Sequence, residues 1–365
     1  MYTVLFVSLI ALLLTYLEQK NTLKYGMFLG FSLLFLIAAI RYNYGNDYVG
    51  YYDIYRDIVS YPLSINDILN RGYRYEPGWI LLNYLSKPIG GFFALSAFVA
   101  LIENLVYYRF IKKYVPIDYW VLAVFIYVFS SNFYLLNMSM LRQGLAISLF
   151  VWSFDYIKDH RLIIALLVSF LAWSIHRSAI VLFPFVLLPY VMKKQALAPV
   201  FAVIIGALFI LFILANNVTE GVYNSVLQYV DMQDYSDYYG EDQQSVNYGI
   251  GFIINLIPFL LLLYYLLKGK VSAVWQRILV VLASVSTLII PFGEIVPMIG
   301  RIGMYFSAFS IAAMPIVFKW IPRRNLAYIT LFLYVFMTLY GYWNFFHSDV
   351  WTRSYKEYHT IFEIL

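Results

Sequence analysis

The sequence predicts an all-α integral membrane protein of about twelve transmembrane helices, with short amphipathic or re-entrant helices in its outer loops. Composition, the length of the apolar runs and the placement of the basic residues support this prediction. Of the 365 residues, 62% are hydrophobic and 12% are charged, whereas roughly 25% of residues are charged in a soluble domain. Because so few charges cannot cover a water-facing surface, much of the chain must face lipid.

Apolar runs able to cross a hydrocarbon core of about 30 Å recur along the whole chain. Each run must be helical, because lipid offers no hydrogen-bond partner to backbone amides. No fixed-period repeat or low-complexity linker separates them, so a single polytopic domain over 1–365 is expected. The expected spans are 2–17, 25–40, 91–110, 117–136, 138–157, 161–175, 178–192, 196–215, 249–267, 271–291, 301–318 and 325–343.

The basic residues orient these spans. If the connector at 18–24 is cytoplasmic and the spans alternate, 14 of the 25 Lys and Arg residues fall in short cytoplasmic connectors, as the positive-inside rule requires. Both termini are then extracytoplasmic. Two long outer loops follow, at about 41–90 and at 216–248. In the first loop, the segment 64–67 resembles a capping box, and 76–89 is expected to form an interfacial or re-entrant helix.

Several function classes lack support. The chain contains no cysteine, which excludes thiol catalysis and Cys-ligated zinc, and its four histidines show no zinc-type spacing. The basic residues are scattered and form no patch typical of nucleic-acid binding. No phosphate-binding glycine loop, dinucleotide fingerprint or serine-hydrolase elbow is present. No cofactor and no metal are therefore expected.

Arginines at the outer ends of spans are the main candidates for chemistry. Arg142 lies in Asn137-Met-Ser-Met-Leu-Arg-Gln143-Gly, and Arg301 opens a span with Tyr305 one helical turn later. Arg41 closes the second span. Arginine binds phosphate bidentately and keeps its charge, so several arginines gathered at one level would suit a lipid-linked pyrophosphate. The alternative is that each arginine reaches a lipid headgroup.

A reaction at a sugar hydroxyl also needs a proton acceptor. His176, followed by Arg177, lies at an outer turn and could act as a general base; a hydrogen-bonded interfacial histidine is the alternative. Asp47 and Glu76 are candidate carboxylates. Tyr48 begins a run of tyrosines at helical spacing, which could stack on sugars or simply pack on the membrane surface.

These residues together resemble the EpsG/Wzy-like family of bacterial polysaccharide polymerases. The resemblance covers 41 to about 305, and its motifs occur in the family's order. The matching segments are Arg41-Tyr-Asn-Tyr-Gly-Asn-Asp47-Tyr48 with Tyr51-Tyr52, then Glu76-Pro-Gly-Trp79, Asn137 with Leu141-Arg-Gln143-Gly-Leu-Ala146, His176-Arg177-Ser-Ala179, and Arg301 with Tyr305. The loop at 216–248 matches no family motif, and it is where this chain's own substrate preference could reside.

The resemblance implies a glycosyltransferase that moves a growing glycan from undecaprenyl pyrophosphate to a lipid-linked oligosaccharide repeat unit. The product would be O-antigen, capsule or exopolysaccharide, made at the extracytoplasmic (periplasmic) face of the bacterial cytoplasmic (inner) membrane. Arg142, Arg301 and Arg41 would hold pyrophosphate, while His176, or else Asp47 or Glu76, would activate the acceptor. Asn137, Gln143, Arg177, Tyr305 and Tyr48 would bind substrate. A chain-length regulator and a flippase are the expected partners, besides membrane lipid.

Two other readings stay open at this point. An O-antigen ligase-like transferase would use the same donor, although such ligases carry a late outer loop with its own His and Arg, and 216–248 has neither. A flippase or transporter of lipid-linked oligosaccharides would be favoured by inverted repeats, and none is evident.

Overall fold

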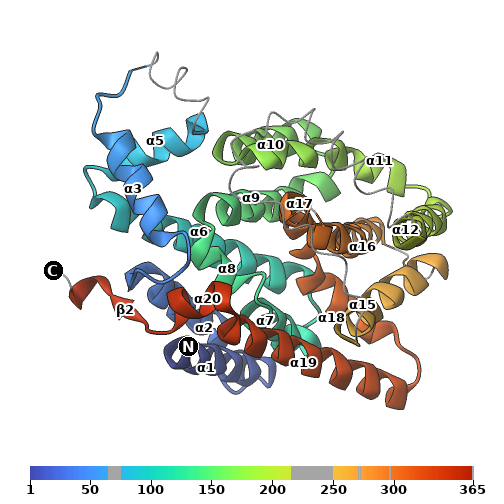
Figure 1. The fold of residues 1–365 in the computed structure, drawn as a ribbon. Coiled ribbons are helices and arrows are strands. Elements are labelled where there is room, and N and C mark those ends of the chain that lie inside the picture. Colours follow the sequence, from blue (N-terminus) through green and yellow to red (C-terminus); the bar gives the residue numbers. More distant parts are fainter. Residues whose placement is uncertain (65–74, 215–249, 270, 272, 296, 364–365) are drawn as a thin grey trace. The chain divides into compact units, whose positions relative to one another are not determined.

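The chain forms an almost entirely α-helical structure (Figure 1). The computed structural model describes residues 1–64, 75–214, 250–269, 271, 273–295 and 297–363. They separate into two compact units: one comprises Met1–Leu188 and Met314–Leu365, and the other Pro189–Ala313. The all-α prediction is confirmed, while the single membrane domain stays a prediction.

In the first unit, five helices coincide with expected spans to within a few residues. Each helix is predominantly apolar, and the charged residues of α6 and α9 include those near the helix ends, which suits burial among helices or in lipid rather than a water-facing surface. The helices are α1 (Tyr2–Gln19), α2 (Gly26–Ile40), α6 (Gly91–Tyr114), α9 (Leu141–Lys158) and α10 (Leu162–Ile175).

Two other expected spans of this unit are interrupted. The run at 117–136 forms the 3-10 helix η1 (Ile117–Tyr119), then α7 (Trp120–Phe129) and α8 (Tyr134–Ser139). The run at 178–192 forms the 3-10 helix η2 (Arg177–Leu187), followed by α11 (Leu188–Met192). Pro184 lies inside η2, and because proline has no amide hydrogen it cannot continue an α-helical ladder.

The first outer loop is largely helical where it is described. It begins with β1 (Arg41–Tyr42) and continues into α3 (Tyr48–Val59), as the tyrosine spacing indicated. The helix expected at 76–89 is confirmed as α5 (Pro77–Ser86), which starts at a proline. Proline is well suited to the first position of a helix, where no intrahelical partner is needed for an amide hydrogen. The expected helix start at 64–67 and the loop at 216–248 lie outside the described residues, except for Ser64.

The C-terminal segment returns to this outer loop. After α19 (Arg324–His347) and α20 (Asp349–Tyr355), the strand β2 (His359–Thr360) pairs antiparallel with β1, and the 3-10 helix η3 (Ile361–Glu363) follows. The terminal amino group of Met1 donates to the carbonyl of Tyr355 at 3.1 Å. Met1 and the segment that contains Tyr355 and β2 therefore lie beside the start of this loop, while the side of the membrane on which they lie stays a prediction.

Ion pairs join the C-terminal ends of α1, α6 and α9. The carboxylate of Asp155 pairs with Arg109 at 3.1 Å and with Lys113 at 2.7 Å, and Glu18 pairs with Lys112. Glu18 lies near the end of α1, about 25 Å along the helix from Met1 at a rise of about 1.5 Å per residue. These basic residues belong to the predicted cytoplasmic set, and the orientation of the helices across the membrane stays a prediction.

The second unit contains α12 (Leu197–Leu214), α15 (Ile250–Leu267), α16 (Val274–Ile295) and α17 (Pro297–Ser307), and α18 (Ser310–Trp320) begins in it. Arg277 of α16 is 3% exposed. Its guanidinium donates to the carbonyls of Met192 at 3.0 Å and Val271 at 2.8 Å. A buried cation needs such partners, and this arginine therefore ties the start of α16 to the preceding connectors.

Among the described residues, three helices are long and apolar enough to cross a membrane by themselves. They are α1, α6 and α19, and a bent pair, Gly300–Ser307 with Ser310–Trp320, could form a fourth. Several shorter apolar helices accompany them. The apolar helices indicate a membrane protein, while the number of twelve spans stays a prediction.

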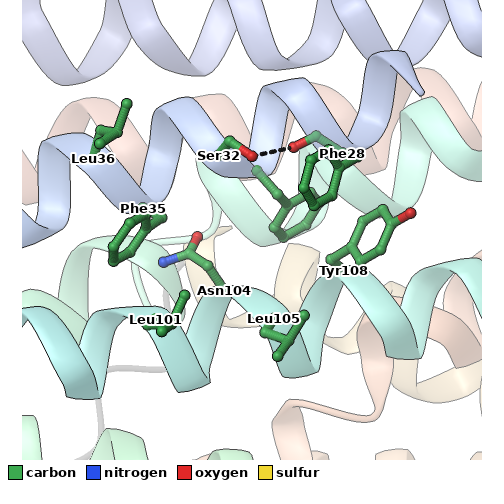
Figure 2. Close-up of a pocket in the computed structure, with 9 residues that line it drawn as sticks. Phe28, Ser32, Phe35, Leu36, Leu101, Asn104, Leu105 and Tyr108 are labelled. Carbon is green, nitrogen blue, oxygen red and sulfur yellow. Dashed lines mark hydrogen bonds between the residues drawn. The ribbon is translucent and has the colours of Figure 1, made fainter. Parts of the chain in front are cut away.

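A cleft of about 320 Å³ lies between α2 and α6 (Figure 2). Its walls are mainly aromatic and leucine side chains (Figure 2). Its two non-aromatic polar residues have partners within the protein: Ser32 Oγ donates to the carbonyl of Phe28 at 2.9 Å, Asn104 Nδ2 donates to that of Ala100 at 2.8 Å, and Asn104 Oδ1 accepts from the Tyr127 hydroxyl at 3.3 Å. None of the lining residues carries a charge or belongs to the sequence motifs. The candidate site therefore lies elsewhere.

Candidate functional site

One carboxylate joins three sequence motifs. Glu76 Oε2 accepts from Arg142 Nη1 at 2.7 Å, and Glu76 Oε1 accepts from the backbone amide of Arg177 at 3.1 Å. The side chains of Glu76 and Arg142 are 8% and 18% exposed. The first outer loop, the start of α9 and the turn after α10 therefore meet at a single, largely buried ion pair.

Glu76 is held there by the packing of α5. It directly precedes α5 in extended conformation, and Gly78 follows two residues later. A Cβ atom at Gly78 would lie 2.4 Å from Ser174 Oγ and 2.8 Å from the Ser174 carbonyl oxygen of α10. Only glycine allows this approach, so the close contact of α5 with the end of α10 brings Glu76 to the following turn.

Arg142 occupies the first turn of α9. The helix is interrupted at Met140, which lies between α8 and α9 and has φ −95° and ψ 64°. A cation in the first turn is unfavourable beside the positive end of the helix dipole, and Glu76 offsets this cost. The ring of Tyr51 lies 5.7 Å from the Arg142 guanidinium carbon. Burial raises the pKa of Tyr51, and the positive charge of Arg142 opposes that shift. Arg142 and the positive end of the helix dipole together favour an anion at this position, which in this structure is the carboxylate of Glu76.

His176 caps the helix that follows it. It lies in extended conformation between α10 and η2, and its Nδ1 accepts from the backbone amide of Ser178 at 3.3 Å. Ser178 Oγ lies 2.7 Å from the same nitrogen. The side chain is half-buried. Because the next residue, Arg177, bonds to Glu76 through its amide, the turn that carries His176 is fixed beside the ion pair.

Asp47 directly precedes α3, and Tyr48 is the first residue of this helix, about one turn before Tyr51. Asp47 is exposed, and its amide donates to Ser139 Oγ at 3.2 Å. Tyr48 is buried: its hydroxyl donates to the carbonyl of Arg41 at 3.2 Å, and burial raises its pKa to about 12. Of the four tyrosines in this helix, Tyr52 is the exposed one, so a sugar could stack on that ring without displacing others.

Arg41 is turned into the protein. It is 1% exposed, and its guanidinium donates to the carbonyls of Ala38 and, at 3.0 Å, Met138. Its guanidinium carbon lies 5.7 Å from the ring of Tyr48. In this arrangement the arginine stabilises the break between α8 and α9. A pyrophosphate could reach it only after those contacts separate.

A second acidic residue, which the sequence motifs did not indicate, lies behind the start of α9. Glu103 of α6 is 4% exposed, and a Cβ atom at Gly144 would lie 2.4 Å from its Oε1 and 3.1 Å from Asn137 Oδ1. Asn137 and Gln143 are themselves 5% and 1% exposed. These buried polar groups therefore pack around the first turn of α9, which carries Arg142. A lone Glu inside an apolar run was the signal that could have revealed Glu103.

Arg301 and Tyr305 lie in the second unit, both in α17. Arg301 is half-buried and Tyr305 is fully buried. Their spacing of four residues places them on one helical face, as expected. Of the predicted site residues, the first unit thus brings together Glu76, Arg142 and the His176 turn.

Within the described part of the chain, no three His, Asp or Glu side chains lie close enough together to hold a metal ion. The first unit offers instead the Arg142–Glu76 ion pair, the imidazole of His176 and the exposed carboxylate of Asp47. Such a set can bind a diphosphate and move a proton.

Comparison with known families decides the classification. The family model described as the EpsG family matches residues 23–360. The chain belongs to the EpsG family. The match includes every candidate residue above, from Arg41 to Tyr305, and it confirms the resemblance seen in the motifs. EpsG membership agrees with a role in polysaccharide polymerisation. No curated protein and no solved structure matches the chain.

Proposed function

We propose that this EpsG-family protein is a polysaccharide polymerase of the bacterial cytoplasmic (inner) membrane. It transfers a growing glycan from undecaprenyl pyrophosphate to the non-reducing sugar of a lipid-linked repeat unit, at the extracytoplasmic face. The observation that carries the proposal is the Glu76–Arg142 pair at the meeting point of three family motifs. An expected flippase would supply the lipid-linked repeat, and a chain-length regulator would act on the product.

The chemistry fits the reaction. Outside the membrane no nucleotide sugar is available, so the donor must arrive activated on a lipid. The acceptor hydroxyl oxygen attacks the anomeric carbon, the bond from that carbon to the diphosphate oxygen breaks, and its electron pair leaves on the diphosphate. The hydroxyl proton passes to a base. Departure of diphosphate needs charge stabilisation more than a proton, and arginine supplies it without a metal.

In this proposal Arg142 binds the diphosphate at the start of α9. Glu76 holds the guanidinium in place when no substrate is bound, because the pair fixes the direction of a long side chain. Arg301 is assigned a second contact to diphosphate on the basis of its motif, and Asp47 and His176 are the groups available for proton transfer. Which sugars are joined depends on other parts of the chain.

Removal of the Arg142 guanidinium tests the proposal. In membranes with a lipid-linked repeat as substrate, Arg142→Ala should lower the polymerisation rate by about 100- to 1000-fold, as for loss of one group that stabilises an anionic transition state. Arg301→Ala should behave similarly. Arg56→Ala, an exposed arginine of α3, is the matched control and should make normal polymer. Full-length polymer from both site variants would refute the assignment.

The phenotype of a cell that lacks the protein distinguishes a polymerase from a ligase and from a flippase. Loss of a polymerase leaves single repeats attached to the cell surface. Loss of a ligase would leave polymer on its lipid carrier, and loss of a flippase would leave repeats at the cytoplasmic face. We expect the first pattern, and either of the others would overturn the proposal.

A further inference from the structure

The hydrogen bonds at His176 fix which ring nitrogen carries its proton. A backbone amide can only donate, and the amide of Ser178 donates to Nδ1 at 3.3 Å. Nδ1 must therefore hold a lone pair. The hydroxyl of Ser178, at 2.7 Å from the same nitrogen, can donate to it as well. A neutral imidazole with an unprotonated Nδ1 carries its hydrogen on Nε2.

This arrangement is unfavourable for a general base. A base must present an unshared nitrogen lone pair to the acceptor hydroxyl, whereas the lone pair of His176 is directed at the amide of its own turn. Moving the proton to Nδ1 would place an N–H opposite the amide N–H of Ser178. That rearrangement would remove the cap at the beginning of η2, so the ring is held as a donor.

We propose that His176 is a hydrogen-bond donor: its Nε2–H binds an oxygen of the diphosphate beside Arg142 and does not accept the acceptor's proton. This inference rests on the proposed polymerase function. The placement supports it, because Glu76 accepts from both Arg142 at 2.7 Å and the amide of Arg177 at 3.1 Å. One carboxylate thus holds the arginine and the imidazole turn on the same anion-binding site.

The proton of the acceptor hydroxyl then passes to a carboxylate. Asp47 is exposed at the start of α3, one turn before Tyr51, whose ring contacts Arg142. Both carboxylate oxygens of Glu76 already accept hydrogen bonds, from Arg142 at 2.7 Å and from the amide of Arg177 at 3.1 Å, so neither is directed at an acceptor hydroxyl. In the balanced step, Asp47 takes the hydroxyl proton as the new glycosidic bond forms, and the diphosphate leaves as an anion stabilised by Arg142 and the Nε2–H of His176.

Substitution of His176 by Gln or by Asn distinguishes a histidine that donates a hydrogen bond from one that accepts a proton. In His176→Gln, the side-chain amide can still present an N–H near the position of Nε2, but it cannot accept a proton. In His176→Asn, the shorter side chain can accept from the amide of Ser178 and preserve the cap, but its N–H does not reach as far. If His176 is a donor, His176→Gln should stay within about 10-fold of the wild-type kcat/KM, and His176→Asn should lose about 100-fold or more.

The pH profile gives a second readout. With Asp47 as the base, kcat/KM of His176→Gln should fall at acidic pH along the same curve as the wild type. Equal and complete loss of activity in both variants would overturn the proposal, and so would wild-type rates in both. A changed acidic limb in His176→Gln would also contradict it, because it would assign that titration to His176.

A spectroscopic test does not depend on activity or on the folding of these variants. The chain has four histidines, and replacing the other three by Gln leaves His176 alone in ¹⁵N-histidine-labelled protein. The ¹⁵N shifts should show an unprotonated Nδ1 and a protonated Nε2 at neutral pH; the opposite tautomer would refute the proposal. If wild-type protein makes no polymer, the proposed function fails, whereas the tautomer result stands separately.

Discussion

Glu76→Gln tests the central contact of the site most directly. The substitution keeps the size and shape of the side chain but removes its charge. One amide oxygen cannot replace two carboxylate oxygens, so either the bond to Arg142 or the bond to the amide of Arg177 is lost. If the amide nitrogen turns toward Arg142, two donors face each other. The ion pair and the anchoring of the His176 turn should both weaken.

The magnitude follows from the burial of the pair. Breaking a fully buried ion pair by removing one partner costs about 3–5 kcal/mol. Arg142 is 18% exposed and Glu76 is 8% exposed, so water can partly solvate the remaining guanidinium. We therefore expect the free energy of unfolding to fall by about 2–3 kcal/mol, close to the value of a single hydrogen bond to a charged group.

Unfolding of purified protein in mixed micelles, followed by titration with a denaturing detergent, measures this change. Asp53→Asn, an exposed carboxylate of α3, is the matched control and should stay within about 0.5 kcal/mol of the wild type. The double variant Glu76→Gln with Arg142→Gln should show a coupling energy of about 1–2 kcal/mol. A stability equal to that of the Asp53 control, with no coupling, would show that the pair does not hold the three motifs together.

Two further predictions concern packing and pH. Gly144→Ala should lower the free energy of unfolding by about 1–3 kcal/mol, because its Cβ would lie 2.4 Å from the buried carboxylate of Glu103; Gly50→Ala, with no heavy atom within 4 Å, is the control and should be neutral or stabilising. At the C-terminus, a hydrogen bond with Glu363 raises the pKa of His359 above 6.5, and the same bond lowers that of Glu363 below 4.5. The histidine's contribution is complete below pH 6.5 and is lost as pH rises through its raised pKa, while the glutamate's is present above pH 4.5 and is lost as pH falls through its lowered pKa. Amide-exchange protection of the C-terminal segment should therefore be greatest between those values, and His359→Gln should remove the alkaline loss; protection independent of pH would contradict the pairing.

The sequence by itself determined the helical class and the family. An apolar run in lipid has no alternative to a helix. The positions of α1, α2, α6, α9 and α10 therefore followed from where the apolar runs lie in the sequence. Motif order was sufficient to indicate the EpsG family. Arg142 and Glu76 could be singled out because a charged residue at the edge of an apolar run is costly and therefore has a reason to be there.

Only the tertiary structure decided which of these charges meet. Arg41 and Arg142 look alike in sequence, yet the first is buried on backbone carbonyls while the second pairs with Glu76. Glu76 and Arg142 are separated by 66 residues, and no local periodicity connects them. Their contact depends on how closely α5 approaches α10, which is fixed by Gly78 and by the interhelical packing.

The protonation of His176 shows the same division. The motif identified an imidazole at an outer turn, which suggested a base. The amide of Ser178 donates to Nδ1, and our proposal of a donor role follows from this contact, because a hydrogen bond, and not residue type, selects the tautomer. Sequence thus determined which groups the protein has, while the fold decided which atoms those groups present to a substrate.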